Sequence, residues 1–279
     1  MATVVMRLKA RLRNAPRLVL PAMLAIATAF LALAPAAAVH GRPSGAACLS
    51  REYQGSRFTV CRYDPASDEL RLASAGVQGP LGGFAALKRS LGPDAGRVRF
   101  AMNAGMYQPD LGPVGLLVEN GAQLHQADVN PGRGNFYLLP NGVFWVDRRG
   151  RARITETREF ELKGRASASG AGAAWATQSG PLLLDRGRPH PAILPDGESR
   201  LIRNGVGTGC RAGAGGAVFV ISEDPVSFGR FMGFFRDGPG CADALYLDGS
   251  ISSLWRPETG RMDSARPLGP MVMVLARRR

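Results

Sequence analysis

The sequence predicts an α+β domain built on a large, mostly antiparallel or mixed sheet with a few helices. Three observations lead to this fold class. Many short segments alternate between apolar and polar residues, few segments have a helical period, and the 36 glycines and 20 prolines follow no repeat. Alternation at a period of two is typical of half-buried strands, and aperiodic Gly and Pro indicate a turn-rich globular chain.

Ten segments have the pattern or the short apolar run expected of a strand. They span residues 57–63, 69–73, 97–102, 114–118, 136–139, 143–146, 182–184, 217–221, 244–247 and 271–275. Pro140-Asn141-Gly142 separates two of them, and this composition predicts a hairpin turn.

Two segments have the pattern of a helix. Phe228, Phe231, Met232 and Phe235 recur at i, i+3, i+4 and i+7, with Ser227 placed to cap the N-terminus. A weaker helical pattern runs near Phe84 to Leu91, whereas 164–172 and 211–216 are rich in small residues and are predicted to be loops.

The first 38 residues have the parts of a secretory signal peptide. Five basic residues precede an apolar run from Leu18 to Ala34, and the small-residue stretch Pro35 to Ala38 offers a cleavage site after Ala38. An uncleaved membrane anchor is the alternative, because Leu18 to Val39 is long enough to cross a bilayer. Residues 39–279 are predicted to form one exported domain, periplasmic or secreted, with its core at about 48–275.

The cysteines support this compartment. Cys48, Cys61, Cys210 and Cys241 all follow the leader, and an even number of cysteines outside the cytoplasm indicates disulfides. Three pairings are possible; we favour Cys48 with Cys61, across the first hairpin, which leaves Cys210 with Cys241. A zinc site is not expected, because there is no C-x-x-C and the three histidines are isolated.

The net charge is positive, but its distribution does not indicate binding to nucleic acid. The formal net charge is +13, of which the leader carries five, and the remaining basic residues are scattered rather than interleaved with aromatics. An anionic envelope polymer or a phosphate-bearing substrate would account for it equally well. We expect no nucleic-acid partner, and a membrane partner only if the leader is retained.

Four clusters place Gly and small polar residues at the ends of predicted strands. They are Ala101 to Tyr107, Thr177 to Pro181, Ile202 to Gly207 and Tyr246 to Ser252. In the last, a strand runs into Asp248, followed by Gly249 and Ser250, whose N–H groups could form an anion-binding nest. Asp248 is therefore a candidate base or nucleophile, although an Asp-Gly turn with a self-capping carboxylate has the same sequence.

The other clusters supply candidate binding groups. Arg203 can offer two parallel N–H donors to a phosphate, unless it forms a surface ion pair. The remaining candidates are polar side chains for a sugar or phosphate and glycines for close approach: Asn103, Gly105, Gln178, Ser179, Gly180 and Gly207. Asn103 could also be a simple turn former after a strand. There is no G-x-S-x-G, H-E-x-x-H or Walker motif, and the G-x-G-x-x-A match at Gly207 does not open a helix.

Taken together and in this order, the four clusters resemble the blocks of the phosphodiester glycosidase family. The blocks are Asn103 to Tyr107, Gln178 to Pro181, Arg203 with Gly205 to Gly207, and Leu247 to Ser250, and the similarity covers roughly Cys48 to Val274. The vertebrate uncovering enzyme of this family has three glycines after its Asp, whereas Ser250 and Ile251 stand at the later positions here.

The resemblance implies hydrolysis of a sugar-1-phosphodiester at the anomeric carbon, as when the uncovering enzyme removes N-acetylglucosamine and leaves a phosphomonoester. The substrate would be an envelope or exopolysaccharide sugar phosphate. A departing phosphate monoester, with a second pKa of about 6, needs little protonation. Arg203 and the nest near Ser250 would stabilise its charge, and Asp248 would act as nucleophile, base or oxocarbenium stabiliser.

Glu223 is the candidate second carboxylate, with Asp224 as the fallback, because it follows the strand that ends at Ile221. No cofactor is predicted. A divalent metal is left open, since Asp110, Glu119 and Asp128 could be ligands but could equally be surface acids. A non-catalytic module of the same fold that binds a phosphorylated glycan is the alternative function, because fold alone does not fix function.

Overall fold

The computed structural model describes residues 46–76, 79–166, 172–211, 215–248 and 251–278. The predicted signal peptide, residues 1–38, lies outside these ranges. Within them, the structure has no helix with the length and apolar character needed to cross a membrane.

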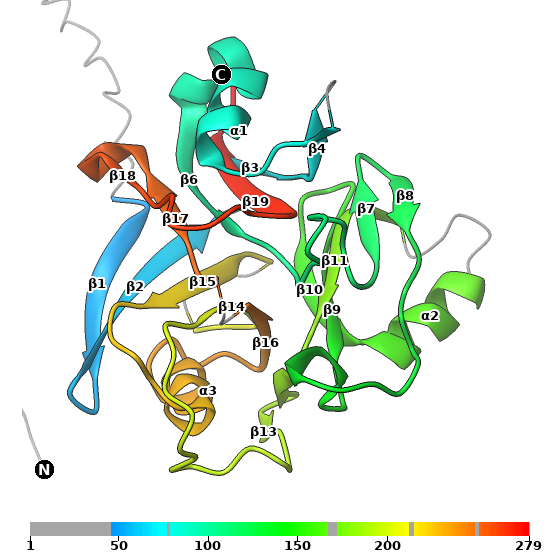
Figure 1. The fold of residues 1–279 in the computed structure, drawn as a ribbon, viewed down its shortest axis with the longest axis vertical. Helices are drawn as coiled ribbons and strands as arrows, with labels where there is room; N and C mark the ends of the chain where they lie inside the picture. Colours follow the sequence, from blue (N-terminus) through cyan, green and yellow to red (C-terminus); the bar gives the residue numbers. More distant parts are fainter. Residues whose placement is uncertain (1–45, 77–78, 167–171, 212–214, 249–250, 279) are drawn as a thin grey trace, which may run out of the picture. The chain divides into compact units, whose positions relative to one another are not determined.

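Seven of the 19 strands in the described residues belong to one antiparallel sheet (Figure 1). In order across the sheet they are β1 (Cys48–Tyr53), β2 (Ser56–Tyr63), β15 (Ala217–Ser222), β14 (Asn204–Thr208), β16 (Asp243–Asp248), β12 (Leu182–Asp185) and β13 (Arg188–Pro189). Since β14 pairs antiparallel with both β15 and β16, those two strands run in the same direction and end at the edge where β14 begins.

Two five-stranded antiparallel sheets complete the β-structure, together with the small ribbon β4 (Ala75–Gly76) and β5 (Gly79–Pro80). One contains β10 (Ala152–Glu156), β9 (Gly142–Asp147), β11 (Ala173–Ser179), β7 (Leu117–Glu119) and β8 (Ala122–His125). The other contains β18 (Arg261–Met262), β17 (Leu254–Arg256), β6 (Val98–Asn103), β19 (Met271–Ala276) and β3 (Asp68–Ala73). In Figure 1 the last strand of the chain, β19, lies between β6 and β3.

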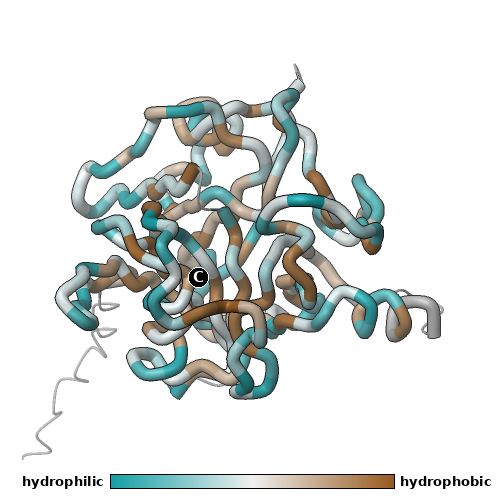
Figure 2. The backbone as a smooth tube through the Cα atoms, turned by 60° about the horizontal axis from the view of Figure 1, so that its bottom comes forward, coloured by the Kyte–Doolittle hydropathy of each residue, from teal (hydrophilic) through white to brown (hydrophobic). Residues whose placement is uncertain are grey.

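The three sheets share one apolar core, and a helix covers the outer face of each. The shared core takes side chains from all three sheets, among them Phe100, Phe144 and Phe219. The covering helices are α3 (Phe228–Asp237) on the seven-stranded sheet, α2 (Thr157–Ala166) on the β9 sheet and α1 (Phe84–Leu91) on the β6 sheet. Hydrophobic stretches of the chain lie largely in the interior of the domain, while many of the outer turns are hydrophilic (Figure 2).

The predicted α+β class is confirmed, as are most of the predicted elements. Eight of the predicted strands coincide with β2, β3, β6, β9, β12, β15, β16 and β19, and both predicted helices form. Ser227 caps α3 as expected, with its Oγ accepting from the Arg230 N–H at 3.0 Å.

Several element predictions were wrong. Residues 136–139 are not a strand, because Asn135–Tyr137 forms a 3₁₀ turn that buries Phe136 and lets Tyr137 donate to Asp128. Pro140 to Gly142 is therefore not a hairpin turn; Asn141 instead donates to the Phe136 carbonyl.

The segment predicted at 114–118 forms a strand only from Leu117. The predicted loop at 164–172 was partly wrong as well, because α2 continues to Ala166, beyond which 167–171 lie outside the described residues. Two further 3₁₀ turns, Gly92–Arg97 and Pro257–Thr259, were not predicted.

Both favoured disulfides are present. Cys48 and Cys61 face each other across the β1–β2 pair, and Cys210 is bonded to Cys241, joining the segment after β14 to the one before β16. The second bridge packs against Gly207, where a Cβ would lie 2.7 Å from Cys241 Sγ and 2.9 Å from the Phe235 ring.

The Ser227 cap gives a direct test of the fold. Ser227→Ala removes the acceptor for the Arg230 amide, and we expect the free energy of unfolding to fall by about 1 kcal/mol in urea titrations. Ser227→Thr should retain most of the stability that the cap contributes. Ser264→Ala, at an exposed position outside any helix, is the control and should change stability little; an equal loss in both alanine variants would contradict the capping role.

Candidate functional site

The four clusters meet at the edge where β15 and β16 end and β14 begins. Asn204, the first residue of β14, pairs with Ile221 near the end of β15 and with Asp248 at the end of β16. The last residue of β6, Asn103, reaches the same edge from another sheet. The site is therefore built from strand ends that are far apart in the sequence.

A buried pair of asparagines joins two of the sheets. Asn103 and Asn204 are both fully buried, and Asn204 Nδ2 donates to the Asn103 main-chain oxygen at 2.9 Å and to its Oδ1 at 3.1 Å. The other side-chain atom, Asn204 Oδ1, accepts from the Asp248 N–H at 2.9 Å. Asn204 thereby fixes the backbone of Asp248 relative to the end of β6.

Asn103 also holds the chain that follows Asp248. Its Nδ2 donates to the Ile251 carbonyl at 2.6 Å, and its Oδ1 accepts from the Ser253 N–H at 2.9 Å. Ser252 Oγ donates to the Asp248 carbonyl at 2.8 Å. Hydrogen bonds thus hold the described residues on both sides of Gly249 and Ser250, and these two residues, the predicted nest, lie outside the described residues. Asp248 itself is only 8% exposed.

The second cluster is joined to the first and the fourth. Ser179 Oγ donates to the Leu247 carbonyl at 2.7 Å, and the Gly105 N–H donates to Thr177 Oγ1 at 3.1 Å. Gly105 and Gly180 are glycines because the backbones touch: a Cβ would lie 2.2 Å from the Gln178 carbonyl oxygen in the first case and 2.5 Å from the Phe136 carbonyl oxygen in the second.

Gln178 uses its side chain inside the protein. Its Oε1 accepts from the Leu116 and Asp128 N–H groups at 3.0 and 2.8 Å, and its Nε2 donates to the Asp128 carbonyl at 2.7 Å and to Thr157 Oγ1 at 3.3 Å. All its hydrogen-bonding positions are occupied. In this arrangement the side chain fixes the loops around residues 116 and 128.

Arg203 is a buried cation at the same edge, not a surface residue. It is fully buried, and its Nε donates to the Val226 carbonyl at 2.8 Å while Nη1 donates to the Tyr246 hydroxyl at 3.1 Å. The guanidinium lies 3.8 Å from the centre of the Phe228 ring, which favours a cation. No carboxylate of the described chain forms an ion pair with it, and burial lowers the pKa of Arg203.

Two tyrosines lie within the electrostatic reach of Asp248. Burial raises the pKa of Tyr107, and the charge of Asp248 adds to the shift. Burial also raises the pKa of Tyr246, where the lowering effect of Arg203 is opposed by Asp248. Tyr107 donates to the Pro267 carbonyl at 2.9 Å. Both hydroxyls are consequently protonated donors beside the site at neutral pH.

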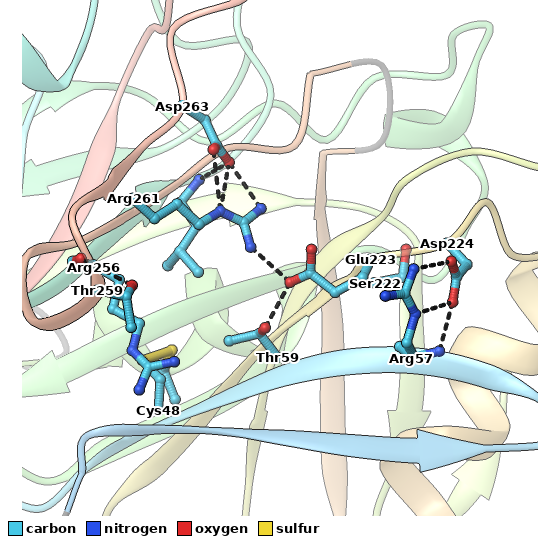
Figure 3. A network of polar contacts seen from close by, with 12 residues as sticks. Cys48, Arg57, Thr59, Ser222, Glu223, Asp224, Arg256, Thr259, Arg261 and Asp263 are labelled. Atoms are coloured by element: carbon cyan, nitrogen blue, oxygen red, sulfur yellow. Dashed lines mark hydrogen bonds and ion pairs between the residues drawn. A yellow bond between two sulfur atoms is a disulfide. The ribbon is translucent and has the colours of Figure 1, made fainter.

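Glu223 and Asp224 lie in a separate polar network (Figure 3). Glu223 Oε1 accepts from Thr59 Oγ1 at 2.6 Å and from Arg261 Nη1 at 2.7 Å, and Asp224 pairs with Arg57 at 2.9 Å. Glu223 follows β15 and Asp248 ends β16 with β14 between them, so their backbones are roughly 10 Å apart, two strand spacings. Of its two partners, Thr59 belongs to β2 and Arg261 to β18 of the β6 sheet.

The structure therefore brings together Asn103, Gly105, Ser179, Arg203 and Asp248, with Gln178 and Gly180 immediately behind them. It does not place Gly207 at the edge, since this glycine lies within β14 beneath the Cys210–Cys241 bridge. The three acids considered as metal ligands, Asp110, Glu119 and Asp128, each accept a hydrogen bond from another residue of the protein. The described chain has no group of three metal-binding side chains.

Sequence reasoning missed Asn204, Thr177, Ser252 and Tyr246 as parts of the site. Asn204 had a signal, because it stands inside the third cluster, at the start of a strand and next to Arg203. Its partners, however, are Asn103 and Asp248, 101 and 44 residues away.

Comparison with known proteins agrees with this architecture. Residues 96–275, more than half of the chain, match the family model described as phosphodiester glycosidase. The chain belongs to this family.

Particular relatives show how far the similarity extends. The chain is 36% identical over 162 residues to the uncharacterized protein YigE of Escherichia coli K12, covering 57% of this chain and 59% of that protein's length. Among solved structures it is similar to the zebrafish N-acetylglucosamine-1-phosphodiester alpha-N-acetylglucosaminidase catalytic domain, auto-inhibited by its pro-peptide, with a TM-score of 0.54, 12% identity and coverage of 83% and 82% of the two chains. A hypothetical protein from Synechocystis aligns with a TM-score of 0.48, 16% identity and coverage of 82% and 61%.

The Asn103–Asn204 pair gives a test of the site's construction. Asn204→Asp removes both donors to Asn103 and adds a charge near Asp248, and we expect the free energy of unfolding to fall by about 3 kcal/mol or more. Asn141→Asp is the matched control: it is also buried but donates one hydrogen bond, to Phe136, and should lose about 1–2 kcal/mol. Equal losses in urea denaturation would show that Asn204 is an ordinary buried amide.

Proposed function

We propose that the protein is an exported glycosidase that hydrolyses a sugar-1-phosphodiester at the anomeric carbon, in envelope or exopolysaccharide metabolism. The observation that carries the proposal is the convergence of all four clusters on Asp248. Family membership supports the reaction class, and the activity for which the zebrafish protein is named, on an N-acetylglucosamine-1-phosphodiester, suggests a similar substrate. The two disulfides suit a compartment outside the cytoplasm.

Asp248 would be the reacting carboxylate. Its main chain is held by Asn204 and Ser252, so the largely buried side chain stands on a fixed backbone. In this position it can attack the anomeric carbon, activate a water, or stabilise the oxocarbenium-like transition state.

Arg203 would act on the departing phosphate through its charge. Its guanidinium is buried and lacks a carboxylate partner in the described chain, so its positive field at the edge is not cancelled locally. A preorganised charge in a low-dielectric environment stabilises negative charge that develops in the transition state. A nest at Gly249 and Ser250 would supply N–H donors to the same phosphate.

The decisive measurement is release of free sugar from a panel of sugar-1-phosphodiesters, beginning with UDP-N-acetylglucosamine. Asp248→Asn should lower kcat by about 10²–10⁴-fold because the amide cannot act as base or nucleophile. Asp243→Asn, at the start of the same strand, is the matched control and should retain activity, since Asp243 only accepts from the Arg186 N–H.

Two results would count against the proposal. Full activity in Asp248→Asn would remove Asp248 from the reaction. Binding of a phosphorylated glycan by the folded wild type with no turnover on any member of the panel would favour the non-catalytic module.

A second prediction concerns Glu223 as the other carboxylate. Glu223→Gln preserves acceptors for Thr59 and Arg261 but removes the charge, and we expect kcat to fall about 10²-fold or more while the melting temperature changes little. Asp224→Asn, at the next residue, is the control. Loss of activity in Asp224→Asn alone would assign the role to Asp224, and activity unchanged in both would leave the Glu223 network as a purely structural feature.

A further inference from the structure

A cavity lies at the opposite ends of the strands that build the Asp248 site. It has a volume of about 520 Å³, and Tyr63, Asp147, Trp175 and Arg277 are among its lining residues. Arg277 directly follows β19, whose first residue, Met271, pairs with Asn103. At about 3.3 Å per residue the two ends of this strand are roughly 20 Å apart, so the cavity is distinct from the Asp248 site.

The cavity is strongly basic. Five arginines and two carboxylates line it: Arg71, Arg97, Arg148, Arg277 and Arg278, with Glu69 and Asp147. Both carboxylates already form ion pairs with arginines. Glu69 pairs with both Arg71 and Arg97, and Asp147 pairs with Arg151 and Arg153, which lie outside the lining. Asp94, nearby, is shared by Arg71, Arg97 and Arg278.

Two of the lining guanidiniums have no carboxylate partner in the described chain. Arg148 is exposed in the turn between β9 and β10 and forms no ion pair there. Arg277 is fixed by its Nε, which donates to the Pro65 and Asp68 carbonyls at 3.1 and 3.0 Å. Only Nε of Arg277 donates these hydrogen bonds. The N–H groups of its two terminal nitrogens can therefore bind a carboxylate or phosphate with two parallel hydrogen bonds.

The wall beside Arg277 is preorganised. Gly150 has a left-handed backbone with φ of +82°, and a Cβ there would lie 3.4 Å from Arg277 Nη2 and 3.0 Å from the Tyr63 hydroxyl. The same hydroxyl donates to the Gly150 carbonyl at 2.7 Å. The half-buried Trp175 contributes an aromatic wall, so the cavity combines fixed cationic donors with an apolar surface.

We propose that this cavity binds a segment of an anionic glycan, with a carboxylate or phosphate group on Arg148 and Arg277 and a sugar ring against Trp175. A concave site lined by an aromatic surface and a few fixed polar groups suits a charged sugar better than a free inorganic anion. The disulfides suit the compartment outside the cytoplasm that we propose, where glycans are abundant anionic polymers. The inference does not depend on turnover at Asp248.

The test is calorimetric titration of the purified protein with tetragalacturonate and with a phosphorylated mannose oligosaccharide, using neutral maltotetraose for comparison. At least one anionic oligosaccharide should bind and maltotetraose should not. Arg148→Glu combined with Arg277→Gln should raise its Kd at least about 10-fold, whereas Asp248→Asn should leave it unchanged. Which oligosaccharide binds identifies the anionic group.

The matched control is Arg51→Glu combined with Arg158→Gln. It makes the same change in net charge at exposed arginines outside the cavity lining and should leave the Kd within about twofold. Arg148→Glu alone keeps the test valid if the double variant unfolds, because Arg148 makes no side-chain hydrogen bond or ion pair in the described chain.

Three outcomes would overturn the proposal. Equal weakening by both double variants would mean attraction by overall charge alone. Absence of binding to either anionic oligosaccharide would mean that the cavity is not a glycan site. Tighter binding of a single-stranded DNA oligonucleotide, lost in the Arg148 and Arg277 variant, would assign the cavity to nucleic acid.

The variant Trp175→Leu tests the aromatic wall. It should weaken binding of the oligosaccharide while leaving any binding of inorganic phosphate unchanged.

Discussion

The hydrogen bonds from Asn204 to Asn103 and from Asp248 to Asn204 are the constraint on which the site depends. Two strands from different sheets end at the same point, so their terminal amide groups are withdrawn from water and must find partners. The two asparagine side chains supply them, and in doing so they fix the Asp248 backbone and the residues after it. An apolar pair of the same size would fill the space but leave the N–H groups of Asp248 and Ser253 unpaired, at a cost of about 1–3 kcal/mol each.

Around this connection the protein uses three kinds of support. Glycines allow backbones to touch at Gly105 and Gly180, Gln178 ties two loops to the end of β11, and Arg203 provides a buried positive charge. Only the last has an evident electrostatic function. This arrangement suits the proposed reaction, because a reaction that expels a phosphate needs positive potential more than it needs a proton donor.

The sequence predicted the fold class and eight of the strands because a half-buried strand leaves a local signature. Alternation in 57–63 and the apolar runs 217–221 and 271–275 follow directly from burial of one or both faces of a sheet. The strand β14 was missed because its sequence, Asn-Gly-Val-Gly-Thr, has low strand propensity. Tertiary contacts decide there, since α3 packs so closely on Gly205 and Gly207 that no side chain fits. Residues 136–139 were misassigned because the apolar run there reflects burial of Phe136 in a 3₁₀ turn rather than in a sheet.

The site was predicted as a set of blocks but not as a geometry. The blocks could be found because strand ends followed by Gly and small polar residues are visible locally. The bonding of Gln178 within the protein, the burial of Arg203 and the pairing of Glu223 with Arg261 could not be found, because each depends on a residue remote in the sequence. Sequence pattern identifies which residues gather, whereas three-dimensional packing decides which of them face the substrate.

The position of β19 has a consequence for folding. This strand comes from the last residues of the chain, yet it lies in the interior of its sheet, paired with β3 on one side and β6 on the other. Since Asn103 belongs to β6, the end of β6 cannot reach its native environment until residues 271–276 have been added. Such non-local topology is typical of slow-folding domains with high contact order. A partly synthesised or C-terminally truncated chain would therefore contain every one of the four blocks and still lack the formed candidate site.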